Sequence, residues 1–127
     1  MTLQLMAAGL PALVMAIGMM TGSGAAGERA TGLMSQDSLG KAIFTGRGNC
    51  YVCHGANAKG GPLGPDLTDA EWLHIDGKVE SIVALVKLGV PLPKQFPAPM
   101  LPMGGAALTD AEIEAVAMYI VSLGPKQ

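Results

Sequence analysis

The sequence predicts an all-α fold in a single domain, and three observations support this. Apolar residues recur three or four positions apart in three segments, which places them on one face of a helix. No segment shows the apolar and polar alternation of a strand. Stretches rich in Gly and Pro separate the helical segments, and 127 residues are few enough for one domain.

The first helix is expected over about residues 37–47, where Leu39, Ile43 and Phe44 share one face. Gly40 lies inside this helix, where a glycine costs helical stability. A close approach by another helix would explain Gly40, because only a glycine leaves room for it, and simple tolerance of the glycine is the alternative.

The middle of the chain is expected to be mostly irregular. Residues 55–70 are rich in Gly and Pro and predict a loop, with a short helical turn at 69–73. A second helix is expected over about 78–88 and ends at Gly89. Residues 90–107 contain five prolines, and irregular stretches of this length are uncommon unless they are functional.

The last helix has the clearest boundaries. Thr109 followed by Glu112 forms a capping-box pattern at its start, and Gly124 and Pro125 end it. An apolar stripe runs along the helix between these signals, with Tyr119 nearby. It consists of Ile113, Val116, Ala117, Ile120 and Val121.

The N-terminus differs in composition from the rest of the chain. Residues 1–27 contain no charged side chain, and residues 3–20 are almost continuously apolar. Small residues follow and suit cleavage after Ala25 or Ala26, so we favour an export signal peptide. The alternative is a retained membrane anchor, because 18 apolar residues are close to the length that spans a bilayer.

These observations divide the chain into three parts. Residues 1–26 are a signal peptide or anchor, residues 27–36 a linker, and residues 37–127 the folded domain. Both interpretations of the N-terminus place the domain outside the cytoplasmic membrane, in the periplasm. The formal net charge of −2 excludes a polybasic surface for nucleic acid.

The segment Cys50–His54 reads Cys-Tyr-Val-Cys-His, a pattern typical of c-type haem attachment. Two thiols at this spacing can each form a thioether with one vinyl group of the porphyrin. His54 can then bind the iron as the proximal ligand. Cys50 and Cys53 are the only cysteines, so the sequence predicts one covalent haem c.

Two other interpretations of the Cys pair are weaker. A thioredoxin-like redox pair belongs to a βαβ pattern, which this sequence lacks. A structural zinc site needs about four ligands, and only His54 and His74 could supplement the two thiolates.

Further candidate site residues lie in the two irregular stretches. A ligating His usually donates its second ring N–H to an oxygen, and the carbonyl of Pro65 is our candidate acceptor. Met100 and Met103 both qualify as the sixth iron ligand, since thioether sulfur suits a low-spin haem. His74 is a competing ligand that would give bis-His ligation.

These residues resemble a class I c-type cytochrome of the bacterial monohaem kind over about residues 37–124. The resemblance rests on five features along the chain. They are Gly40 with Phe44, the Cys50–His54 motif, Gly64-Pro65-Asp66-Leu67, Met100 before Gly104-Gly105, and the Leu108-Thr109 helix start with Tyr119.

The resemblance implies a class I cytochrome c fold, with helices packed around the haem and a close contact of the first and last helices. The family's ligand Met is commonly followed by Pro, whereas Leu101 follows Met100 here. This difference leaves Met100 and Met103 both open, although the distance to Gly104 favours Met100.

The resemblance also implies a task. We expect a non-enzymatic carrier of single electrons between a donor and an acceptor protein, with transient docking. The alternatives are a membrane-anchored haem subunit of an oxidase or dehydrogenase complex, and an enzyme or gas sensor with an open iron site.

Overall fold

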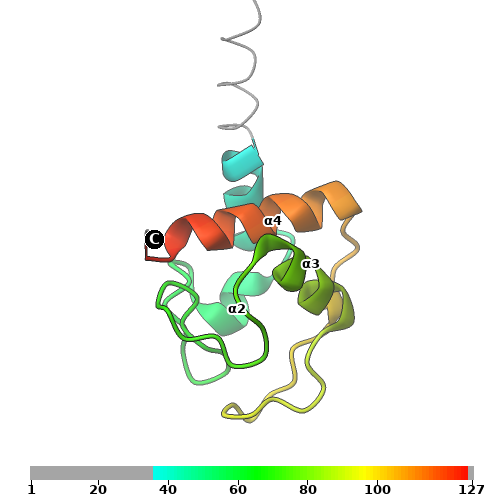
Figure 1. The fold of residues 1–127 in the computed structure, drawn as a ribbon. Helices are drawn as coiled ribbons and strands as arrows, with labels where there is room; N and C mark the ends of the chain where they lie inside the picture. The colour runs from blue at the N-terminus through cyan, green and yellow to red at the C-terminus, as the bar shows by residue number, and fades with distance from the viewer. Residues whose placement is uncertain (1–35, 126–127) are drawn as a thin grey trace, which may run out of the picture.

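A computed structural model describes residues 36–125 of the chain, and every structural statement below concerns this part. Helices and irregular loops make up the described residues, and the only β pairing in them is an isolated bridge between Val90 and Met100. The expected all-α fold is therefore confirmed (Figure 1). Its helical elements are residues 36–44, α2 (Cys50–His54), α3 (Val79–Leu88), the 3-10 turn η1 (Pro102–Gly105) and α4 (Asp110–Leu123).

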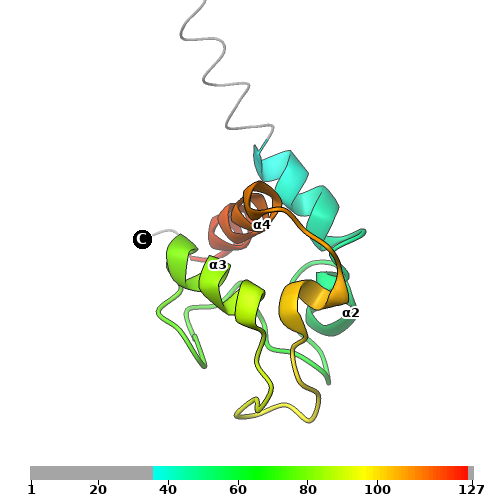
Figure 2. The ribbon, with the colours of Figure 1, turned by 90° about the vertical axis from the view of Figure 1, so that its right-hand side faces the viewer.

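The first helical segment crosses α4 at a close contact (Figures 1 and 2). A methyl group at Gly40 would overlap the carbonyl oxygen of Ala115 and would lie 2.8 Å from the Cβ atom of Tyr119. Beside this point the rings of Phe44 and Tyr119 meet edge to face, with centroids 5.7 Å apart. The expected approach of a second helix at Gly40 is confirmed.

The predicted face of the first helix is wrong at one residue. Ile43 and Phe44 are buried, but Leu39 is 43% exposed. The backbones of the first helix and α4 are closest at Gly40. The buried face of the first helix therefore centres on Gly40 and on the residues one turn later, and Leu39 lies at its edge. The helix also ends at residue 44, where a turn over 45–48 leads into α2.

Helices α3 and α4 match their predicted positions. Ile82 and Val86 of α3 are buried, and α3 packs against both α4 and η1. The Thr109 side chain accepts a hydrogen bond from the amide of Glu112, whose carboxylate accepts one from the Thr109 amide. The predicted capping box is thus confirmed.

Residues 69–73, expected to form a short helical turn, form bends instead. The Asp69 carboxylate accepts a hydrogen bond from the Glu71 amide at 2.9 Å. This contact is of the kind found at a helix N-terminus, but no helical turn follows it, so the prediction was wrong.

The expected signal peptide or anchor (1–26) and residues 27–35 of the expected linker lie outside the described residues. Residue 36, expected to be the last of the linker, is already helical. Within residues 36–125, no helix has both the length and the apolar character needed to cross a bilayer.

Candidate haem-binding site

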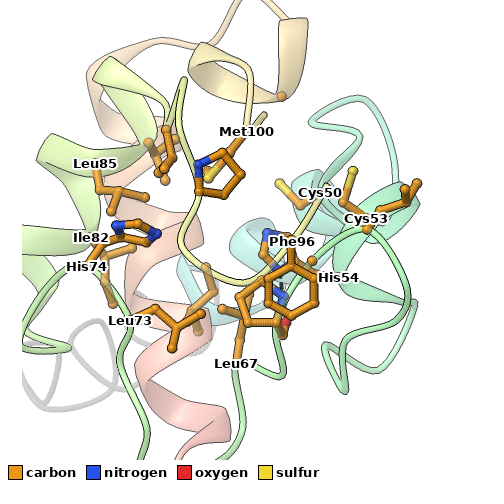
Figure 3. Close-up of a pocket in the computed structure, with 18 of the residues that line it drawn as sticks. Cys50, Cys53, His54, Leu67, Leu73, His74, Ile82, Leu85, Phe96 and Met100 are labelled. Atoms are coloured by element: carbon orange, nitrogen blue, oxygen red, sulfur yellow. Dashed lines mark hydrogen bonds between the residues drawn. The ribbon is translucent and has the colours of Figure 1, made fainter. Parts of the chain in front are cut away.

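Helix α2 brings the cysteines and the histidine of the motif to one place. Asn49 precedes α2 in the left-handed conformation (φ 56°), which Asn tolerates better than most residues, and this turns the chain into the helix. Cys50 and Cys53 are three positions apart and share one side of α2. Both are half-buried and neither forms a disulfide, so both thiols are available for thioether formation. Figure 3 shows them together with His54 at one wall of a cavity.

The loop after α2 folds back and fixes the imidazole of His54. The Nδ1 atom of His54 lies 3.0 Å from the carbonyl oxygen of Pro65, the acceptor expected from the sequence. Hydrogen bonds from the Gly60 amide to the His54 carbonyl, and from the Leu67 amide to the Ala58 carbonyl, hold this loop in place. A hydrogen bond at Nδ1 leaves Nε2 as the ring nitrogen with a free lone pair.

The chemistry of these groups matches this geometry. Burial lowers the pKa of His54, partly offset by the hydrogen bond to Pro65, so the imidazole favours its neutral, metal-binding form. Burial raises the pKa of the Cys50 thiol to about 11. Redox-active thiols have a lowered pKa, so the raised value argues against a thioredoxin-like pair.

The cavity beside α2 has a volume of about 400 Å³, within the range of about 300–1,000 Å³ found for ligand pockets. Its lining is predominantly apolar and comes from every part of the described chain. Phe44 contributes from the first helix, Leu67 from the loop after α2, Ile82 and Leu85 from α3, Phe96 from the proline-rich stretch and Val116 from α4.

The candidate sixth ligands differ in position. Met100 is half-buried and lines the cavity, and its backbone amide and carbonyl pair with those of Val90 at 3.0 and 2.8 Å. Met103 packs against the hydrophobic core but does not line the cavity. His74 lines the cavity from the opposite wall, where it is exposed (Figure 3). The structure therefore brings Met100 and His74, but not Met103, to the site.

Several wall residues were not singled out from the sequence. Leu73 and Phe96 line the cavity, and the Lys94 ammonium group donates to the Leu73 carbonyl at 2.6 Å, joining the two irregular stretches. No periodicity marks such residues, because they come from loops whose partners only the fold brings together.

This donor set fits a covalently bound haem. Two thiols and a neutral imidazole lie on one wall, and a thioether and broad apolar surfaces complete the cavity. It does not fit a structural zinc ion, because residues 36–125 contain no group of three or more His, Cys, Asp and Glu side chains placed to hold a metal.

Known proteins point the same way. The family model "Cytochrome c" matches residues 38–124. The subunit CcoP of the cbb3-type cytochrome c oxidase from Rubrivivax gelatinosus is 33% identical over 88 residues, which cover 68% of this chain and 25% of that protein. CcoP of Rhodobacter capsulatus is 38% identical over 94 residues (68% and 30%), and subunit FixP of Sinorhizobium medicae is 33% identical over 88 residues (68% and 29%).

The chain thus spans between 25% and 30% of the length of these relatives. The comparison with solved structures found no significant match. The family match covers well over half of the chain and includes all the elements around the cavity. The chain belongs to the cytochrome c family and is an electron-transfer protein whose family implies a covalently bound haem c.

Proposed function

We propose that this domain holds one haem c through Cys50 and Cys53, with His54 and Met100 as axial ligands, and carries single electrons to an oxidase. When bound, the haem supplies an iron that alternates between two oxidation states. The observation that carries the ligand assignment is that Met100 is half-buried in the cavity wall whereas Met103 is outside it.

The protein's own residues serve this function in three ways. The carbonyl of Pro65 holds the His54 ring in one orientation and tautomer. Apolar side chains from α3 and α4 line the cavity and would cover the haem against water. The Val90–Met100 bridge holds the backbone at Met100, which limits how far the residue that carries the thioether can move. A methionine ligand also raises the reduction potential.

The proposed partner follows from the relatives. Those compared above are named as subunits of cbb3-type cytochrome c oxidases, which favours the subunit alternative over a freely diffusing carrier. We therefore place the domain at such an oxidase, on the outer side of the cytoplasmic membrane. Two exposed apolar side chains of the cavity wall, Val52 between the cysteines and Leu63 in the loop after α2, suit a contact with a protein partner.

The ligand assignment is tested by optical spectra of the full chain matured with haem. We expect a low-spin spectrum with the weak red methionine–iron band, lost in Met100→Ala and retained in Met103→Ala and His74→Ala. Loss of the band only in Met103→Ala would move the ligand to Met103. A bis-His spectrum that is altered only in His74→Ala would identify His74. A high-spin native spectrum that responds to carbon monoxide would instead favour an open iron site.

The partner assignment needs a separate test. Membranes from cells that produce the matured chain are washed with high salt and solubilised in mild detergent, and the chain is isolated through an affinity tag. We expect haem-stained protein that co-purifies with oxidase activity. Haem protein recovered in the soluble periplasmic fraction without oxidase activity would favour the freely diffusing carrier.

A further inference from the structure

Arg47 connects the turn before α2 to the chain that follows η1. It lies in the turn before α2, outside the motif. Its Nη1 atom donates to the carbonyl oxygen of Ala107 at 3.3 Å, and its Nη2 atom forms an ion pair with Glu112. Both partners follow Met100 in the chain, so these contacts connect the segment before the cysteines to the segment after Met100.

A direct backbone contact lies beside this ion pair. Gly104 in η1 has φ 65°, and a methyl group there would overlap the carbonyl oxygen of Gly48. The turn before Cys50 and the turn after Met100 therefore touch through glycine backbones. Arg47 lies in the same turn as Gly48, and its contacts with Ala107 and Glu112 add to this backbone contact.

Glu112 has a second role that makes the junction rigid. One carboxylate oxygen of Glu112 pairs with the Arg47 guanidinium group, and the other accepts a hydrogen bond from the Thr109 amide at 2.9 Å. Arg47 is thus connected to the capping box that begins α4 and ends the loop after η1. The stretch from Met100 to Ala107 is held at Met100 by the bridge to Val90 and at Ala107 by the hydrogen bond from Arg47.

We propose that Arg47 is a positioning residue, which holds the loop of Met100 closed over the cavity through Glu112 and Ala107. This inference rests on the proposed ligation by Met100. The pair is too exposed to contribute much to global stability, since the Arg47 side chain is 54% exposed. Loss of the pair lowers the free energies of loop opening and of unfolding by the same small amount, but opening breaks far fewer contacts and is therefore the more sensitive measurement.

The test measures loop opening and unfolding separately in the matured protein. Imidazole binds the ferric iron only when Met100 has left it, so imidazole affinity reports opening. Arg47→Gln and Glu112→Gln should each raise this affinity roughly 1.5-fold to fivefold. The Gln at position 112 keeps the capping box, because Gln serves there as Glu does. The double variant should raise the imidazole affinity little beyond either single variant, because both single changes remove the same ion pair.

Lys87→Gln is the matched control. Lys87 forms an exposed ion pair with Asp110 at 2.8 Å, also at the start of α4, but it does not reach the turn before α2. We expect imidazole affinity in this variant to equal that of the wild type. Arg47→Lys should have an imidazole affinity between those of the wild type and Arg47→Gln. Lys keeps the charge but lacks the fork that reaches two acceptors.

Three results would count against the proposal. Equal imidazole affinity in Arg47→Gln and Lys87→Gln would overturn it. A loss of unfolding free energy several times larger than the gain in imidazole-binding free energy, measured by urea titration with far-UV circular dichroism, would show a merely structural role and would also overturn it. A wild-type spectrum without the methionine–iron band would overturn the ligand assignment itself, which separates that failure from failure of the Arg47 proposal.

Discussion

The ring of Phe44 meets the ring of Tyr119 at 64° with a centroid distance of 5.7 Å, at the point where the first helical segment crosses α4. Gly40 lies one turn before Phe44 and touches the backbone of α4 at Ala115. This crossing holds the wall that contributes Phe44 and Val116 to the cavity. A change at the crossing therefore reaches the haem site through packing.

Gly40→Ala should destabilise the folded protein by about 2 kcal/mol. Alanine gains about 0.5–1 kcal/mol in helix propensity, but the methyl group overlaps the Ala115 carbonyl and forces the helices apart. Urea unfolding of the matured protein measures the difference. Gly124→Ala is the control, because a methyl there would make an ordinary contact of 3.5 Å with the Val121 carbonyl. A Gly40→Ala protein as stable as the wild type would contradict the close crossing.

The chain without haem should lack a cooperative fold. Without haem, the apolar lining of a cavity of about 400 Å³ stays in contact with water, and the contacts that the haem would make with separate parts of the chain are missing. Domain stability is only about 5–15 kcal/mol, so the loss of this much apolar burial removes a large part of it. Far-UV circular dichroism of Cys50→Ser/Cys53→Ser, compared with the matured wild type, tests this expectation. A sigmoidal urea transition in the haem-free variant would count against it.

Thr109→Ala should cost about 1 kcal/mol of unfolding free energy, because it removes the side-chain oxygen that accepts from the Glu112 amide. Thr45→Ala is the control, since its hydroxyl is exposed and donates only to the Lys41 carbonyl one turn earlier. We expect that control within about 0.5 kcal/mol of the wild type. Urea denaturation of both variants measures the difference, and equal losses would argue against the capping role.

Asp66 should make the free energy of unfolding depend on pH in the acidic range. The Thr68 hydroxyl donates to Oδ1 of Asp66 at 2.6 Å, as does the Thr68 amide, and these bonds hold the pKa of Asp66 below its ordinary value of 3.8. A lowered pKa in the folded state adds stability above pH 3.8, which is lost as the pH falls through the folded-state pKa.

Asp66→Asn should therefore lose less stability than the wild type between about pH 5 and pH 2. Thr68→Val should show a similar, smaller flattening, because it removes the hydroxyl donor and keeps the amide. Urea midpoints at several pH values test both variants. An acid dependence in Asp66→Asn as steep as that of the wild type would exclude Asp66 as its source.

The sequence by itself determined the elements whose signals are local. The motif Cys50–His54 depends on spacing along one chain, and α4 on a capping box and an apolar stripe, so both could be predicted. Gly40 could be interpreted as the site of a close helix approach, because a glycine inside a helix costs helical stability. Local signals failed at residues 69–73, where the Asp69 side chain accepts from the Glu71 amide as at a helix start but no helical turn follows.

Only the tertiary structure decided which methionine faces the cavity and what holds its loop. Met100 and Met103 are chemically identical and three positions apart in an irregular stretch with no period to orient them. Their directions depend on the Val90 bridge and on the contact of Gly104 with Gly48, which join residues far apart in the chain. The exposure of Leu39 was decided in the same way, by where the partner helix α4 makes its closest approach.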